Sequence, residues 1–178
     1  MGCDKTTMRK KNKLRLLLFK ECDRNCDGCC NKRWNLDTLE VESNFKGYSE
    51  IILTGGEPML DPSMVIRTIR RIRKEAGGGT KIYMYTAKLD EPHTLLIVLE
   101  YLDGLTVTLH EPSDIGDFMA FSNLLFEVDG RSLRLNSFDG VDLSGIDLSN
   151  WKVKEGVKWI KDCPLPEDEV FRRLDTIV

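Results

Sequence analysis

Short apolar runs rich in β-branched residues alternate along this chain with longer amphipathic stretches. Three of the runs read EIILT at 50–54, KIYMYT at 81–86 and LTVTLH at 105–110. Each has the length and composition of a buried strand. Strands that alternate with helices form parallel sheets with right-handed crossovers, so the alternation predicts an α/β fold.

The same pattern predicts further elements before, between and after these three runs. Strands are expected at 14–19, 132–136 and 155–160, and helices at 62–76, 90–102, 112–126 and 167–174. The first helix has the clearest boundaries, because Asp61-Pro62 is typical of an N-cap followed by proline in the first turn, and Gly77-Gly78-Gly79 would end it. The stretch 139–150 is expected to be a turn-rich connection.

Five or six βα units are too few to close an eight-fold barrel, whereas 178 residues suffice for one domain with its own core. We therefore expect a single domain over residues 1–178, an α/β fold in the form of a partial, open (βα)5–6 barrel with parallel strands and outer helices. Residues 1–12 are expected to form a flexible N-terminal segment. In such folds, binding and catalytic groups gather at the carboxyl ends of the strands.

Charge and hydropathy argue against nucleic acid and membranes as partners. The formal net charge is −3 and the pI is near 5.5, so the composition gives no sign of the basic surface that binds nucleic acid. A basic run at 9–15 is local and is interpreted as solvated. No apolar run is long enough for a membrane span or a secretory signal. We expect a cytoplasmic protein, in a reducing compartment where structural disulfides are rare.

Four of the six cysteines lie within nine residues, at Cys22, Cys26, Cys29 and Cys30. A disulfide framework, a zinc site and an iron–sulfur cluster are the candidate explanations. The spacing C-x3-C-x2-C places three thiolates on one short loop, where each can bind a different iron of a cubane. The fourth iron would then remain open to a substrate, as in open catalytic metal sites.

A zinc site would need a fourth Cys or His at a recognisable spacing, and His93 and His110 are distant in sequence. An iron–sulfur cluster is therefore favoured, with structural zinc and incidental buried cysteines as alternatives. Cys30, directly after the third cysteine, is expected to be a packed spare thiol that points away from the cluster. Cys3 and Cys163 have no partner spacing and are interpreted in the same way.

A second motif, LTGGEP at 53–58, closes the strand at 50–54. C-x3-C-x2-C after a first strand, followed by Gly-Gly-Glu-Pro at the end of a second, resembles the radical S-adenosylmethionine superfamily. The resemblance implies a [4Fe-4S] cluster held by Cys22, Cys26 and Cys29, whose open iron binds S-adenosyl-L-methionine. It further implies that the methionine amino group of this cofactor is bound by the Gly-Gly-Glu-Pro motif, which consists of Gly55, Gly56, Glu57 and Pro58.

The activity implied by this resemblance is that of an oxidoreductase-like radical enzyme. One electron, from a donor such as flavodoxin or ferredoxin, would pass through the cluster and cleave the cofactor to methionine and a 5′-deoxyadenosyl radical, which abstracts hydrogen from the substrate. Thr86 and His110 end strands at the edge suited to ribose or carboxylate contacts, and Arg134 and Asn136 are further candidates near the cofactor. Gly28 departs from the superfamily pattern, in which an aromatic residue near the adenine often precedes the third cysteine. No catalytic residue is identified.

Two local stretches, CCNKRW at 29–34 and YMYTAKLDE at 83–91, resemble the activating protein of anaerobic ribonucleotide reductase. This implies a glycyl radical enzyme, or another macromolecular substrate, docking across the open side of the barrel. A small radical enzyme acting on a small molecule, nucleoside or peptide is the alternative. A non-catalytic iron–sulfur or zinc module is the second alternative, although such a module has no use for the Gly-Gly-Glu-Pro motif.

Overall fold

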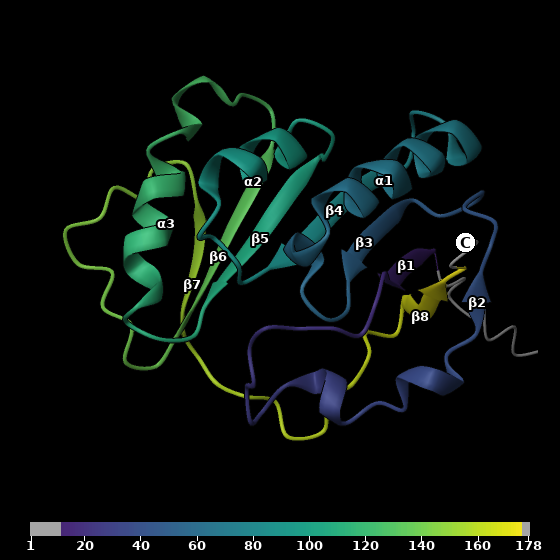
Figure 1. Cartoon of the computed structure of the whole chain (residues 1–178), viewed down its shortest axis with the longest axis horizontal. Coiled ribbons are helices and arrows are strands. Elements are labelled where there is room, and N and C mark those ends of the chain that lie inside the picture. Colours follow the sequence, from purple (N-terminus) through teal and green to yellow (C-terminus); the bar gives the residue numbers. More distant parts are fainter. Residues whose placement is uncertain (1–11, 176–178) are drawn as a thin grey trace, which may run out of the picture.

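The computed structural model describes residues 12–175, and its framework is a sheet of eight parallel strands in the order β2-β8-β1-β3-β4-β5-β6-β7 (Figure 1). The expected flexible segment 1–12 lies outside the described residues except for its last position. The strands are β1 (Lys13–Leu17), β2 (Val41–Glu42), β3 (Glu50–Thr54), β4 (Lys81–Thr86), β5 (Gly104–Leu109), β6 (Ser132–Phe138), β7 (Lys152–Val157) and β8 (Glu169–Leu174).

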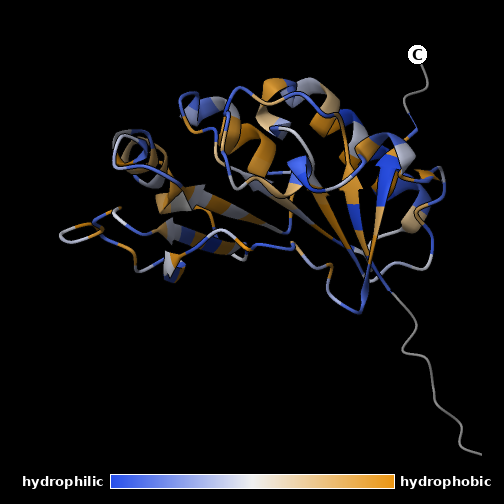
Figure 2. Cartoon of the chain, turned by 90° about the horizontal axis from the view of Figure 1, so that it is seen from below, coloured by the Kyte–Doolittle hydropathy of each residue, from blue (hydrophilic) through white to orange (hydrophobic). Residues whose placement is uncertain are grey.

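Three α-helices cover one face of this sheet (Figures 1 and 2). They are α1 (Pro62–Ala76), α2 (Pro92–Leu99) and α3 (Asp114–Ser122), and short 3-10 helices occur at Cys30–Lys32, Leu36–Thr38, Pro58–Leu60 and Leu125–Glu127. As expected, the Asp61 side chain caps α1 by accepting a hydrogen bond from the Met64 N–H at 2.8 Å. Gly77, with φ +82°, ends this helix.

The hydrophobic core lies between the helices and the sheet. One row of strand residues in register consists of Leu16, Leu53, Met84, Leu105 and Leu133, none more than 5% exposed. Figure 2 shows hydrophobic residues concentrated in the central strands and in the helices above them. Burying each such side chain contributes about 1.5–3 kcal/mol, so this face provides most of the driving force for folding.

The opposite face, called the inner face here, carries polar side chains. Because side chains alternate along a strand, the residues between the buried ones point away from the helices. The register joins Tyr85, Thr106, Arg134 and Lys152 across four neighbouring strands of this face. The concave side of the sheet therefore combines polar side chains with aromatic and aliphatic ones such as Tyr83 and Ile52.

The predicted α/β class, a partial open barrel of parallel strands with outer helices, is confirmed. The predicted strands at 14–19, 50–54, 81–86, 105–110, 132–136 and 155–160 correspond to β1, β3, β4, β5, β6 and β7, although β7 begins three residues earlier than expected. The helices predicted at 90–102 and 112–126 form over the shorter spans of α2 and α3.

The helix predicted at 167–174 is wrong, because residues 169–174 form β8, a strand paired with both β1 and β2. The backbone of this segment completes the ladder beside β1, and this pairing outweighs the local helix propensity. Among residues 12–175, no helix combines the length and apolar composition that crossing a bilayer requires.

Candidate functional site

A cavity of about 440 Å³ lies at the carboxyl ends of the strands. Its walls come from the cysteine loop (residues 21–34), the ends of β3 to β6, and the C-terminal segment (residues 158–168). In Figure 1 the purple-blue cysteine loop and the yellow segment between β7 and β8 run close together beyond the strand ends. Eight residues predicted for the site line this cavity: Cys22, Cys26, Cys29, Gly56, Glu57, Thr86, His110 and Asn136.

The thiols of Cys22, Cys26 and Cys29 are free and line this one cavity. Partial burial raises the pKa of the Cys22 and Cys26 thiols above the ordinary value, so metal binding there would release protons. Within residues 12–175, no three His, Cys, Asp or Glu side chains surround a point suited to a single metal ion. Cluster thiolates bind different irons and need not converge on one point, so the donor set fits an iron–sulfur cluster.

The Gly-Gly turn after β3 packs directly against the start of the cysteine loop. Gly55 and Gly56 have φ +94° and +24°, and a Cβ on Gly56 would overlap the backbone carbonyl of Glu21. The Glu57 N–H also donates to the Glu21 carbonyl at 2.8 Å. The turn therefore fixes the residue that precedes Cys22. Gly55 and Pro58, also predicted for the site, do not line the cavity.

Glu57 joins the ends of β3 and β4. Its carboxylate, on a residue only 3% exposed, accepts hydrogen bonds from the Thr86 hydroxyl at 2.5 Å, the Ala87 N–H at 2.9 Å and the Met59 N–H at 3.0 Å. Burial raises the pKa of this carboxyl, although all three hydrogen bonds act in the opposite direction. Because the Thr86 hydroxyl donates a hydrogen bond to Glu57, Thr86 holds the Gly-Gly turn in place as well as lining the cavity.

Two ion pairs, neither of which was predicted, anchor the cysteine loop to the strand ends. Arg24 donates hydrogen bonds to both carboxylate oxygens of Asp114, at 2.6 and 3.0 Å. Asp114 also accepts a hydrogen bond from the backbone N–H of His110 at 2.7 Å. Lys88 lies 3.1 Å from Asp23. Burial acts to raise the pKa of Asp114, but the Arg24 and backbone hydrogen bonds outweigh it and lower that pKa.

Three aromatic rings form one wall of the cavity. His110 stacks on Trp159, with ring centres 5.1 Å apart and planes inclined by 8°, and both rings contact Phe138. A Cβ on Gly28 would overlap the Trp159 side chain, so Trp159 occupies the space beside the third cysteine. An aromatic side chain of the C-terminal segment therefore lies against Gly28.

His110 has an unused hydrogen-bonding atom. Its buried Nδ1 has no hydrogen-bond partner in the described part of the chain. Burial and the nearby Arg24 charge lower the His110 pKa, which favours the neutral imidazole. A buried polar atom without a partner is costly, so Nδ1 is a candidate hydrogen-bonding atom for a bound molecule or an ordered water.

Cys30 and Cys163 form a disulfide across 133 residues, with Cα atoms 5.5 Å apart. The interpretation of both as unpartnered spare thiols is therefore wrong. Compartment and spacing arguments could not reveal this pair, because the chain brings Cys163 beside the cysteine loop only after β7. The bond links the cysteine loop to the C-terminal segment.

The two candidates on β6 differ in position. Asn136 lines the cavity and its Nδ2 lies 3.5 Å from the Thr108 hydroxyl. Arg134 does not line the cavity; it lies one inner-face position before Asn136 on the same strand. Of the two, only Asn136 is placed to contact a molecule inside the cavity.

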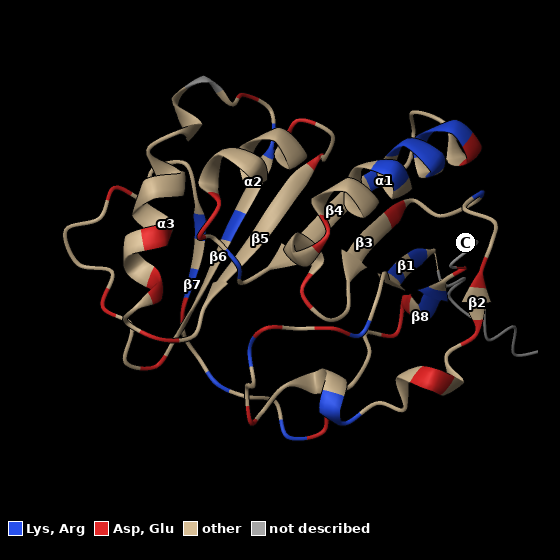
Figure 3. Cartoon of the chain, viewed as in Figure 1, with Lys and Arg blue, Asp and Glu red and all other residues tan. Residues whose placement is uncertain are grey.

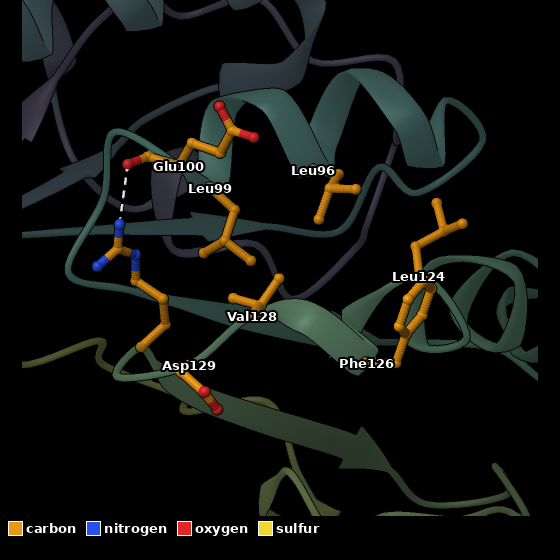
Figure 4. Close-up of a pocket in the computed structure, with 8 residues that line it drawn as sticks. Leu96, Leu99, Glu100, Leu124, Phe126, Val128 and Asp129 are labelled. Carbon is orange, nitrogen blue, oxygen red and sulfur yellow. Dashed lines mark hydrogen bonds between the residues drawn. The ribbon is translucent and has the colours of Figure 1, made fainter.

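A second cavity of about 370 Å³ lies on the helix-covered side, between α2 and the connection from α3 to β6 (Figure 4). Arg131 there donates to the Glu100 carbonyl oxygen at 3.0 Å. The lining contains no thiol or imidazole and is unsuited to a cluster: Leu96, Leu99, Glu100, Leu124, Phe126, Val128, Asp129 and Arg131.

No family model matches this chain, and no curated protein does either. Any assignment of function therefore rests on the motifs and on the geometry of the first cavity.

Proposed function

We propose that this protein is a radical S-adenosylmethionine enzyme. One observation carries the proposal. The three thiols of C-x3-C-x2-C and the Gly-Gly turn lie at the same cavity, at the carboxyl ends of parallel strands. When bound, a reduced [4Fe-4S] cluster would supply the electron that cleaves S-adenosyl-L-methionine to methionine and a 5′-deoxyadenosyl radical. The chain itself would supply the cluster ligands and the groups that orient the cofactor.

In this proposal Cys22, Cys26 and Cys29 hold the cluster. The turn at Gly56, fixed by its contact with the Glu21 carbonyl, presents backbone groups at the cavity wall. Such groups can bind the amino end of the cofactor. A Gly56→Val substitution should disturb the cysteine loop as well as cofactor binding, because its side chain would displace the Glu21 backbone.

The polar and aromatic walls would orient the rest of the cofactor. The rings of His110, Phe138 and Trp159 offer flat surfaces for a purine, and His110 Nδ1 offers one unpaired hydrogen-bonding atom. Arg24 and Asp114 keep the cysteine loop at the ends of the strands, which maintains the position of the thiols relative to these rings. Their role is therefore one of positioning.

Activation of a glycyl radical enzyme is our proposal for the substrate. Support comes from the local resemblances at 29–34 and 83–91 and from the uncovered inner face, which leaves room for a protein to approach. The alternative, a small-molecule substrate, is supported by the cavity volume of about 440 Å³, which lies within the range of ordinary ligand pockets.

The decisive experiment is anaerobic reconstitution with iron and sulfide, followed by reduction in the presence of S-adenosyl-L-methionine. We expect about four irons and four sulfides per chain, and 5′-deoxyadenosine among the products. Cys26→Ala should abolish both, whereas Cys30→Ala should retain the cluster. Stoichiometric zinc with no iron–sulfur absorbance, or no 5′-deoxyadenosine above the Cys26→Ala control, would refute the proposal.

The substrate is tested separately by mixing the reduced enzyme and cofactor with a candidate glycyl radical enzyme. An electron paramagnetic resonance doublet from a glycyl radical, absent with Cys22→Ala, supports activation. Turnover of a free small molecule at enzyme-like rates, without a protein radical, supports the alternative.

A further inference from the structure

Three cations lie next to one another on the inner face, beside the cavity. They are Arg134 of β6 and Lys152 and Lys154 of β7, all exposed. Figure 3 shows the basic positions of these two strands side by side. We call these three residues the cationic patch.

The sheet register places all three side chains on the same face. Leu133 and Leu135 are buried under the helices, so Arg134 between them points to the inner face. Arg134 is in register with Lys152, and Asn136 with Lys154. Neighbouring strands are about 4.8 Å apart and alternate residues about 6.6 Å apart, so the three side chains can reach one bound group.

Two other cations of the inner face, on β1, are paired with acids. At the other end of the sheet, Lys13 lies 3.2 Å from Asp168, and Arg15 lies 2.9 Å from the largely buried Glu169. Within residues 12–175, no member of the cationic patch has an ion-pair partner. Glu155, the acid nearest in sequence, lies where the register between β6 and β7 shifts, and it forms no ion pair with any of the three cations.

Protection of an exposed edge does not account for the patch. Lysines on an edge strand discourage pairing with other chains, and this reason applies to Lys152 and Lys154 of β7. It does not apply to Arg134, because β6 is paired on both sides, with β5 and β7. The shared feature of the three residues is their uncompensated charge on a concave polar surface.

We propose that the cationic patch binds an anionic group of the substrate, a phosphate or a carboxylate. Arg and Lys together are the usual protein ligands of such groups, and Arg can bind them through two parallel hydrogen bonds. Asn136, in register with Lys154, lines the cavity, so a substrate held at the patch would extend toward the thiol-lined end. Only the identification of the bound anion as substrate rests on the proposed function; anion binding itself does not.

The test uses the full-length protein, with pyrophosphate and citrate as separate probes, monitored by titration calorimetry and by amide chemical shifts. The variant is Arg134→Gln with Lys154→Gln. The matched control is Arg67→Gln with Lys74→Gln, which removes the same two charge types from exposed positions of α1. Circular dichroism and thermal melting establish that both variants fold.

We expect the amide shifts of β6 and β7 to change on titration, and the patch variant to weaken binding by about tenfold or more. The control should weaken it less than about twofold, since the charge it removes lies away from the patch. Tighter binding of pyrophosphate indicates a phosphate-bearing ligand, and tighter binding of citrate a carboxylate. Equal weakening in both variants, shift changes spread over other elements, or no binding of either probe would overturn the proposal. If the double variant fails to fold, Lys154→Gln alone and the wild-type shift map decide.

Discussion

The two faces of the sheet come from the same strands but differ in what their side chains do. On the helix-covered face, residues such as Leu53 and Met84 are fully buried and make only packing contacts. On the inner face, residues such as Thr108 and Asn136 are partly exposed and line a cavity. Strand alternation thus gives the sheet one face that packs against the helices and another that lines the cavity.

The inner face itself divides into two ends. Lys13 and Arg15 of β1 are paired with acids and partly buried, whereas the three residues of the cationic patch on β6 and β7 are exposed and have no ion-pair partner among residues 12–175. Between the two ends, the cysteine loop and the C-terminal segment are held by a few specific bonds rather than by a packed core. Substitutions should therefore have large effects on stability on the helix side, intermediate effects at these bonds, and small effects at the cationic patch.

The largest effect is expected for Phe118→Ala on α3. Phe118 is fully buried and packs against Trp151, with ring centres 5.1 Å apart. Its truncation should lower the free energy of unfolding by about 3–5 kcal/mol, measured by urea denaturation. Phe138→Ala on the inner face is the matched control and should cost clearly less. Equal losses in the free energy of unfolding for the two substitutions would contradict the expectation that the helix-covered face contributes more to stability than the inner face.

The second effect concerns the bond between Cys30 and Cys163. Because this disulfide closes a long loop, it should stabilise the oxidised protein by about 2–4 kcal/mol relative to Cys163→Ser. A thermal melt with and without dithiothreitol tests this. The reductant should lower the melting temperature of the wild type and leave that of the variant unchanged. Identical melting of the wild type with and without reductant would show that the bond does not hold the segment.

Most of the fold could be predicted from the sequence because the helix-side pattern is local. The run at 50–54 and the cap at Asp61 specify their elements without distant partners, and both occur as expected. The segment 169–174 could not be predicted in this way, because its strand depends on pairing with β1. Its residues are buried at the two ends and half-buried between them, a pattern without the alternation that marks a strand in a sequence.

The candidate site likewise has parts that local motifs predict and parts that depend on contacts between distant segments. Cys22 to Cys29 and the Gly-Gly turn are compact motifs, and their meeting at one cavity follows from parallel strands whose ends share an edge. The pairing of Trp159 with Gly28 depends on contact between segments far apart in the sequence, and no spacing rule encodes it. In the sequence, Gly28 is only a departure from the superfamily pattern, and nothing there points to Trp159.

A third, smaller effect is expected for Asp114→Asn, which weakens the link between the cysteine loop and α3. Loss of the charged hydrogen bonds to Arg24 should cost about 2 kcal/mol near neutral pH. The folded-state pKa of Asp114 is lowered from 3.8, so its contribution is complete above that value and is lost as the pH falls through the lowered pKa.

Urea denaturation of the wild type and of Asp114→Asn at a series of pH values measures this contribution. The difference between the two proteins should be constant near neutral pH and should shrink as the solution becomes acidic. A difference that grows with acidity would show that Asp114 is not held in its charged form by Arg24.

The smallest effect is expected at Arg134, and it tests the contrast between the two ends of the inner face. Arg15→Gln would leave Glu169, 7% exposed, without its cationic partner, and should cost about 1–3 kcal/mol. Arg134→Gln removes an exposed charge without a partner among residues 12–175, and should change the free energy of unfolding by less than about 0.5 kcal/mol. Both values come from urea denaturation at the same ionic strength. If the two substitutions cost the same, the Arg134 charge serves the fold, and its availability for an anionic ligand loses its main support. If only Arg15→Gln is costly, the charge at β6 is free for binding, and weaker pyrophosphate or citrate binding in its absence can be attributed to lost contacts rather than to a loosened sheet.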